Sequence, residues 1–103
     1  MAMQNFAYRP TEETVHSTNL YKLARKLGYS KIEELYDFAD REPEKFWPNV
    51  VEDCNINFEK KYSKVMDSSS GVPFTRWFVG GSISAEYNCV GRWKNSRSVA
   101  IKW

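Results

Sequence analysis

The chain has 103 residues, of which 42% are hydrophobic and 27% charged, a balance typical of a globular protein rather than a disordered one. This length suits one domain and leaves little room for two, and about two thirds of the unfolded surface can be buried at this size. The formal net charge of +2 is too small to indicate a nucleic acid or an anionic membrane as a partner by itself.

The sequence predicts a cytoplasmic location. The first ten residues, MAMQNFAYRP, contain no apolar stretch of the kind that marks a secretory signal. No run of residues approaches the roughly 18 apolar positions that a membrane-spanning helix needs. Cys54 and Cys89 lie far apart in the sequence and form no CxxC pair, so we expect two reduced, packed thiols.

A helix is predicted to begin after Thr11, whose hydroxyl can cap it, and the acidic residues that follow complement the helix dipole. Gly28 can end this helical region in a left-handed conformation. The pattern leaves open whether one helix runs over 11–27 or two helices break near 17–18. Apolar residues spaced along one helical face are Leu20, Leu23, Ala24 and Leu27.

Two further helices are predicted between residues 30 and 54. Ser30 and Glu33 fit a capping box, and Pro43 suits the first position of the second helix. Pro48 lacks the N–H that a helix interior requires, so we expect a kink or a restart there. The apolar stripe of the first helix is Ile32, Leu35, Tyr36 and Ala39. The predicted buried face of the second is Phe46, Trp47, Val50, Val51 and Cys54.

The C-terminal half predicts a loop over 66–73 (MDSSSGVP) and a short strand over 74–79 (FTRWFV). Ser82 or Ser84 can cap a helix that runs to about Arg92, and the last six residues, SVAIKW, predict another strand. The expected fold class is mainly α (α+β), a small helical domain of three to five helices with one or two short β-strands. We expect residues 1–103 to form this single domain.

Gly80 and Gly81 raise the question of a phosphate-binding loop. A Walker-type loop requires a lysine after its glycines, and here Ser-Ile-Ser-Ala follows. The dinucleotide-binding pattern G-x-G-x-x-G is also missing. We therefore expect a tight turn between an aromatic strand and a helix, where glycine tolerates a positive φ.

No catalytic, cofactor-binding or metal-binding residue is predicted. His16, Cys54 and Cys89 supply at most three soft ligands at irregular spacing, whereas a structural zinc usually takes four. No G-x-S-x-G elbow presents a serine for a triad that would have to use His16, which we expect near a helix surface. Acidic pairs such as 33–34 and 52–53 lie among lysines and predict solvated helix faces.

The C-terminal end is more basic than the rest of the chain, since Arg92, Lys94, Arg97 and Lys102 follow the last acid, Glu86. A solvated basic face is the simplest interpretation. Tryptophans beside arginines, as in RWF and GRWK, also fit a surface for single-stranded nucleic acid, although the small net charge argues against it. A stand-alone module that binds protein or single-stranded nucleic acid is therefore the alternative hypothesis.

The order of three stretches resembles the N-terminal domain of AMP-forming acyl-CoA synthetases of the acetyl-, propionyl- and acetoacetyl-CoA synthetase group. They are DREPEKFWPNVVED, YSKVMDSSSGVPFTRWFVGGSISAEYNCVGRW and SVAIKW. The resemblance covers about residues 20–103, nearly the whole chain. The residues expected to carry family motifs or interactions are Phe46, Trp47, Trp77, Phe78, Gly80, Gly81, Asn88, Arg92 and Trp93.

This resemblance implies a mostly helical accessory domain that lies against the adenylation core of a cytoplasmic ligase. Such enzymes use ATP, Mg²⁺ and coenzyme A to make acyl-CoA through an acyl-adenylate. The family's adenylation core and C-terminal lid domain are absent from these 103 residues, so a fragment or truncated relative without catalysis or cofactors of its own is expected. The expected partner is such a core or a second copy of the chain, with nucleic acid and membrane disfavoured.

The sequence departs from the family pattern at two places. Ile83-Ser84 stands where the family usually has Leu-Asn, and Gly91-Arg92-Trp93 stands where it often has Asp-Arg-His. If those residues tie the domain to the core, the docking surface of this chain has altered.

Overall fold

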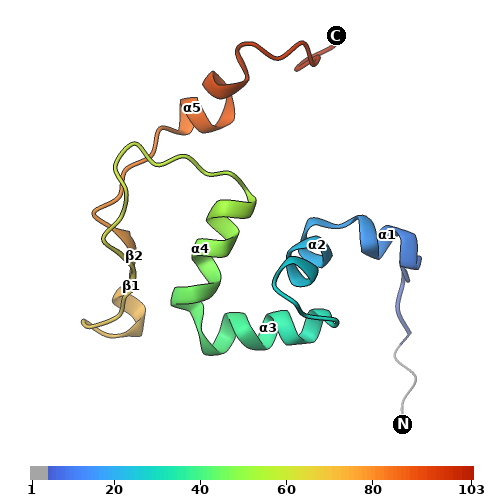
Figure 1. Ribbon diagram of the computed structural model, residues 1–103, viewed down its shortest axis with the longest axis horizontal. Coiled ribbons are helices and arrows are strands. Elements are labelled where there is room, and N and C mark those ends of the chain that lie inside the picture. The colour runs from blue at the N-terminus through green and yellow to red at the C-terminus, as the bar shows by residue number, and fades with distance from the viewer. Residues whose placement is uncertain (1–4) are drawn as a thin grey trace. The chain divides into compact units, whose positions relative to one another are not determined.

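The structure is a computed structural model that describes residues 5–103 (Figure 1). The described residues form five α-helices, two 3₁₀ helices and one two-stranded sheet, which confirms the predicted helical α+β class. They fall into two compact units that divide between Pro43 and Glu44, and each unit is described by itself. A single domain over 1–103 stays a prediction. Residues 1–4, the first part of the stretch that shows no secretory signal in the sequence, lie outside the described residues.

The N-terminal unit begins with two short helices, α1 (Glu12–Ser17) and α2 (Asn19–Lys26). Thr11 caps α1 as predicted, with its Oγ1 accepting a hydrogen bond from Thr14 N at 3.2 Å. Thr18 separates the helices because its backbone is extended, and its Oγ1 accepts from Tyr21 N at 3.3 Å as the cap of α2. The open question of one helix or two is thus resolved in favour of two.

Gly28 ends α2 as predicted. Its φ is +87°, and the two N–H groups that follow the helix bond back to it, Gly28 N to Arg25 O at 3.1 Å and Tyr29 N to Ala24 O at 2.9 Å. This pair of bonds is a Schellman motif, which satisfies carbonyls that a helix end otherwise leaves open.

The next helix, α3 (Ile32–Arg41), begins with a capping arrangement one residue later than predicted. Glu34, not Glu33, reaches back, and its Oε2 accepts from Ser30 N at 3.0 Å and from Lys31 N at 2.9 Å. The hydrogen bond from Lys31 N, followed by that from Ser30 N, lowers the pKa of the Glu34 carboxyl below its usual value. The sequence pattern does not distinguish the two residues, because Glu33 and Glu34 carry the same functional group and are adjacent in the first turn.

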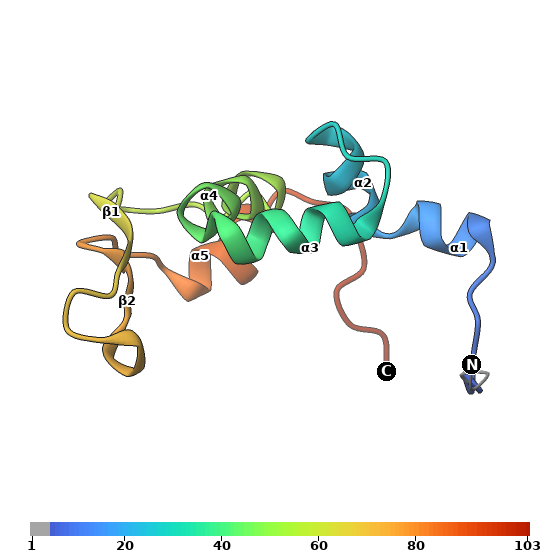
Figure 2. The same ribbon diagram turned by 90° about the horizontal axis from the view of Figure 1, so that it is seen from below.

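Helices α2 and α3 pack on each other and form the core of this unit (Figure 2). Leu23, Ala24 and Leu35 are buried, with Leu35 fully excluded from solvent. Tyr36, predicted in the apolar stripe, is 52% exposed, because it lies next to Leu35 on the outer side of the helix. The small size of this core leaves the unit dependent on few side chains.

The second unit contains most of α4 (Pro43–Asp53), which begins at Pro43 as predicted. It continues through Pro48 without the expected restart. Next to the proline, the Asn49 side chain donates from Nδ2 to Lys45 O at 2.8 Å. No described residue of α4 is fully buried, so the predicted broad buried face is wrong, and Trp47 is 38% exposed.

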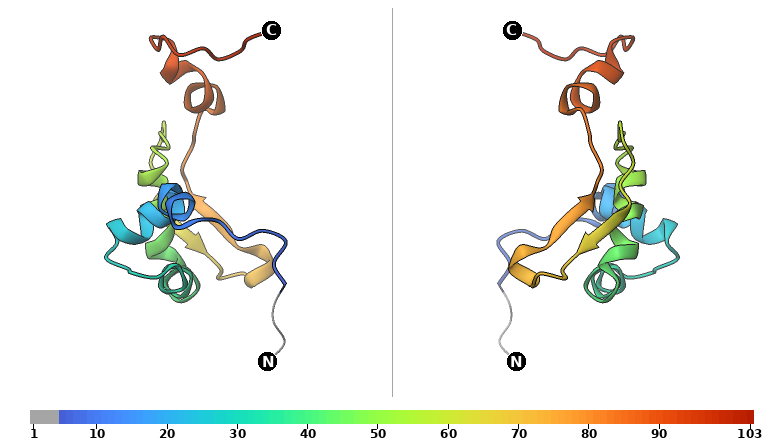
Figure 3. Two further views of the ribbon diagram at one scale, coloured as in Figure 1. Left: turned by 90° about the vertical axis from the view of Figure 1, so that its right-hand side faces the viewer. Right: turned by 90° about the vertical axis from the view of Figure 1, so that its left-hand side faces the viewer.

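Two strands, β1 (Lys64–Asp67) and β2 (Arg76–Val79), form an antiparallel hairpin (Figure 3). The register places Lys64 opposite Val79 and Asp67 opposite Arg76. Strand β1 is not among the predicted elements, and its last two residues fall within the predicted loop over 66–73. The predicted strand over 74–79 begins only at Arg76, since Val72–Phe74 form a 3₁₀ helix, η1.

The chain ends with α5 (Ala85–Cys89), the 3₁₀ helix η2 (Gly91–Trp93) and an irregular segment. Ser84 is the cap, because its Oγ accepts from Tyr87 N at 3.0 Å. The predicted helix to Arg92 is broken at Val90, whose φ of −129° leaves the helical range. The predicted strand over 98–103 is wrong, since no strand among residues 5–103 pairs with this segment and supplies its backbone bonds.

Candidate functional site

The paired glycines form a tight turn, as predicted. Gly81 N donates to Phe78 O at 3.0 Å, and Gly80 between them has a φ of +77°. A Cβ atom on Gly81 would lie 3.1 Å from Phe78 O, from the Phe58 ring and from Tyr62 Cβ. The turn is therefore filled by the protein itself, and its crowded surroundings do not fit a bound phosphate.

An aromatic cluster packs beside this turn. The rings of Phe58, Tyr62 and Phe78 form a triad with centroid separations of 5.1, 5.1 and 5.7 Å. Phe78 has a φ of +49°, which is unusual for a bulky residue and needs compensation from its surroundings. The structure thus places Phe78 in a half-buried aromatic cluster, and no pattern in the sequence predicts that Phe58 and Tyr62 join it.

A second aromatic group lies closer to solvent. The Trp47 ring of α4 meets the Trp77 ring of β2 edge to face, with centroids 6.0 Å apart and planes at 72°. These side chains are 38% and 46% exposed, and Phe46 packs on the Trp47 ring at 5.3 Å. We call Trp47 and Trp77 the aromatic face, which brings two predicted interaction residues together.

The tip of the hairpin exposes further apolar surface. Val72 and Phe74 of η1 are 81% and 70% exposed. The loop that presents them is internally bonded: the hydroxyls of Ser68 and Thr75 lie 2.9 Å apart, and Thr75 Oγ1 donates to Val72 O at 2.7 Å. The tip is pre-organised, which lowers the entropy cost of binding a partner.

Asp67 fastens the base of this loop. Its Oδ1 accepts from Ser69 N at 3.0 Å, its Oδ2 lies 2.9 Å from Arg76 Nη2, and Lys64 Nζ is 3.8 Å away. Hydrogen bonds from Ser69, then from Arg76, hold the pKa of Asp67 well below its usual value. The carboxylate is therefore ionised at neutral pH and holds the two strand ends together.

Asn88 and Arg92, both predicted as motif residues, face inward. Asn88 exchanges two hydrogen bonds with the backbone of Asn57, at 2.7 and 2.9 Å, and Arg92 Nη1 donates to Asn55 O. The Arg92 guanidinium also lies over the Trp93 ring, 4.9 Å from its centroid. These contacts hold α5 and η2 against the segment after α4 and leave Trp93 55% exposed.

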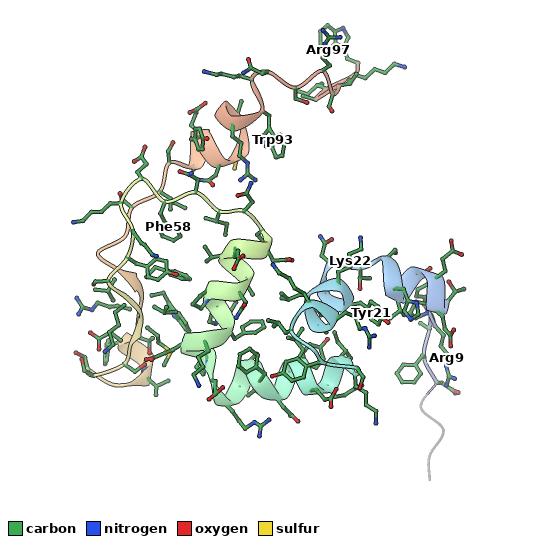
Figure 4. The ribbon with its side chains drawn as sticks, viewed as in Figure 1. Arg9, Tyr21, Lys22, Phe58, Trp93 and Arg97 are labelled. Carbon is green, nitrogen blue, oxygen red and sulfur yellow. The ribbon has the colours of Figure 1, made fainter. Side chains whose placement is uncertain are left out.

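The remaining candidate groups are scattered. His16 is exposed and stacks on Tyr21 with ring centroids 4.4 Å apart. Figure 4 shows Tyr21 in the N-terminal unit. Cys54 and Cys89 are both free and exposed, so the prediction of packed thiols is wrong in that respect. Within the described part of the chain, no three His, Cys, Asp or Glu side chains gather to hold a metal ion. None of the helices over residues 5–103 has the length and apolar character to cross a membrane.

An open hollow of about 760 Å³ lies between α5 and the C-terminal segment. Its walls include Cys89, Val90, Trp93 and Val99, which make it mainly apolar. Glu86 and Lys94, which carry opposite charges, also line it. Apolar walls with a few charged side chains are typical of a binding surface.

Comparison with known proteins places these features in a family. The family described as "Acetyl-coenzyme A synthetase N-terminus" matches residues 32–89, from α3 to the end of α5. The chain is 27% identical over 92 residues, 89% of its length, to an acetyl-coenzyme A synthetase of Pasteurella multocida. It is 30% identical over 87 residues to the synthetase of Methanothrix soehngenii and 37% identical over 73 residues to that of Mycolicibacterium smegmatis.

The chain spans only a small part of these relatives. It covers 13% of the Pasteurella multocida protein, 13% of the Methanothrix soehngenii protein and 7% of the Mycolicibacterium smegmatis protein. The matches to the Methanothrix soehngenii and Mycolicibacterium smegmatis proteins take in 82% and 68% of this chain. No solved structure matches the chain.

Proposed function

This chain belongs to the acetyl-coenzyme A synthetase N-terminus family, and we propose that it serves as a non-catalytic accessory domain of an AMP-forming acyl-CoA synthetase. The match over 32–89 carries this proposal, because it takes in the hairpin, the glycine turn and α5 together. ATP, Mg²⁺ and coenzyme A would be bound by the adenylation core of such an enzyme. A cytoplasmic location stays a prediction.

The geometry supports a packing role rather than a chemical one. The glycine turn is filled by the Phe58–Tyr62–Phe78 triad, and Asn88 and Arg92 are engaged with the backbone of the same unit. Side chains that could react are therefore not gathered at the motif residues, whereas apolar side chains are exposed near them. Contiguous exposed apolar surface commonly marks a binding site for another protein surface.

We propose that the aromatic face and the hairpin tip dock on the adenylation core. Trp77 lies on the same strand-loop element as Val72 and Phe74, and all three are more than 40% exposed. Large aromatic side chains on a bonded, pre-organised loop are typical of the residues that dominate binding energy. Docking would remove the apolar surface of these side chains from water, which favours binding.

Binding to a separately produced core tests this docking. The intact chain is titrated into the Pasteurella multocida synthetase made without the region that this chain matches, with heat release measured. We expect binding that Trp77→Ala and Phe74→Ser each weaken by about tenfold or more. Tyr8→Ser, which removes an aromatic ring 71% exposed in the other unit, is the matched control and leaves binding unchanged. Absence of binding by the unaltered chain would sink the docking proposal.

The absence of catalysis is tested on the chain alone. Incubation with acetate, ATP, Mg²⁺ and coenzyme A is expected to release AMP at the rate of a blank. Turnover proportional to the concentration of the chain, and lost on heat denaturation, would overturn the non-catalytic assignment.

A further inference from the structure

The C-terminal segment after η2 combines positive charge with exposed apolar side chains. Val99 and Ile101 are 78% and 77% exposed, and Trp103 is fully exposed. Lys94, Arg97 and Lys102 accompany them, and no acidic side chain follows Glu86. Figure 4 shows Arg97 on the irregular segment beyond η2. A partner for this segment must offer apolar contact and negative charge together.

The outer face of α3 has this character. Glu33, Tyr36, Asp37 and Asp40 recur at i, i+3, i+4 and i+7, which places them along one face of the helix, and all four are exposed. Tyr36 lies among the three acids with its side chain 52% exposed. The one basic residue of α3 is Arg41, which lies at its C-terminal end and donates from Nε to Asp37 O at 3.3 Å.

We propose that two copies of this chain associate, with the C-terminal segment of one copy docked on the acidic face of α3 of the other. Three cationic side chains then meet three carboxylates, and the Tyr36 ring offers a surface to Ile101 and Trp103. Each copy carries one surface of each kind, so each copy can both donate its segment and accept that of another copy. This proposal does not depend on the proposed function.

The separation of charge within the chain favours a second copy over other anionic partners. A nucleic acid or an anionic vesicle would attract the C-terminal segment but would repel the acidic face of α3. A second copy offers carboxylates to the segment and cationic side chains to that face. Complementary charges across an interface mainly determine its specificity and its rate of formation, and solvent-exposed pairs weaken in salt. The association is therefore salt-sensitive.

Sedimentation equilibrium of the intact chain at low and high salt tests the association. We expect a species larger than the monomer at low salt, with an association constant at least about tenfold smaller at high salt because the charges are screened. A monomer at every concentration in low salt overturns the proposal. Association that is indifferent to salt also overturns it, because the charges would then be irrelevant.

A charge exchange identifies the two surfaces. Arg97→Glu with Lys102→Glu reverses the C-terminal segment, and Asp37→Lys with Asp40→Lys reverses the face of α3. Each variant alone is expected to be monomeric, whereas an equimolar mixture associates again because every contact regains opposite charges. If the mixture stays monomeric while both variants keep the helical circular dichroism of the unaltered chain, the proposed contact is wrong.

A charge control and an apolar variant complete this test. Lys22→Glu with Lys61→Glu makes the same change in net charge at exposed positions elsewhere and leaves association intact. Trp103→Ser weakens association without any change in charge. Binding of the unaltered chain to phosphatidylserine vesicles as a monomer, lost in the Arg97→Glu, Lys102→Glu variant, would assign the segment to a membrane instead and overturn the proposal. None of these measurements uses a synthetase core. Failure of the self-association proposal therefore does not bear on the proposed accessory role.

Discussion

The side-chain amide of Asn88 pairs with both backbone groups of Asn57. Its Oδ1 accepts from Asn57 N at 2.7 Å, and its Nδ2 donates to Asn57 O at 2.9 Å. The same Nδ2 also donates to Ser84 O at 2.9 Å. One side chain thereby joins the start of α5 to a segment 31 residues earlier in the sequence.

Replacement of this amide should loosen the second unit. Asn88→Ala leaves the N–H and the carbonyl of Asn57 without their partner, so we expect a loss of about 1 kcal/mol in the free energy of unfolding. Asn88→Asp should be no better, because a carboxylate keeps the acceptor but repels the Asn57 carbonyl. Urea denaturation measures both variants, and Asn95→Ala at an exposed position is the control. Equal midpoints for Asn88→Ala and the unaltered chain would contradict the pairing.

Asp67 predicts a pH dependence of stability. Because its pKa in the folded chain lies below the ordinary value of 3.8, its ionised form is stabilised by folding. This contribution is complete well above pH 3.8 and is lost as the pH falls below it. The unaltered chain should therefore exceed Asp67→Asn in stability at pH 7, and the difference should shrink as the pH falls from about 4 to about 2.

The comparison with Asp67→Asn is necessary because the pKa of Glu34 is lowered as well and adds a dependence of the same sign. Urea midpoints of the two proteins across this pH range give the difference that belongs to Asp67. A difference that stays constant or grows on acidification would show that the hydrogen bonds of Ser69 and Arg76 to the Asp67 carboxylate do not stabilise the hairpin.

The two glycines of the turn should respond differently to substitution. Gly80 has a φ of +77° and only Ser63 Oγ, at 3.6 Å, near a Cβ, so Gly80→Ala should cost about 1–2 kcal/mol through its backbone conformation. Gly80→Asn should cost less, since asparagine tolerates this conformation better. At Gly81 the obstacle is crowding, so Gly81→Asn should be at least as harmful as Gly81→Ala. Thermal denaturation of the four variants gives the order, and a milder Gly81→Asn would refute the steric explanation.

Leu35 is the residue on which the N-terminal unit depends most. It is fully buried, and α3 packs on α2, whose buried residues are Leu23 and Ala24. Leu35→Ala should cost about 2–5 kcal/mol, which is enough to unfold a small unit with so few buried side chains. Amide hydrogen exchange should show lost protection in α2 and α3. Leu20→Ala, at a position 39% exposed, is the control that keeps protection. Retained protection in Leu35→Ala would mean that other contacts hold the unit.

Local chemistry in the sequence was sufficient to predict much of the secondary structure. Thr11 caps α1, Gly28 ends α2, and Pro43 begins α4, because each acts through backbone groups within about five residues. The capping box moved by one residue, from Glu33 to Glu34, because neighbouring carboxylates can reach the same turn. The family resemblance, confirmed over 32–89, rested on the order of motifs and not on any single contact.

The sequence by itself therefore determined where most helices begin and the glycine turn, which depend on short-range pattern, and it determined the family through the order of its motifs. Only the tertiary structure decided that Phe78 joins Phe58 and Tyr62, that Asn88 faces inward, and that the last six residues find no strand to pair with. These outcomes rest on contacts between residues far apart in the chain, 31 positions for Asn88 and Asn57 and 37 for Arg92 and Asn55. Such contacts form only when the chain has folded, because the entropy of closing the intervening loop must first be overcome.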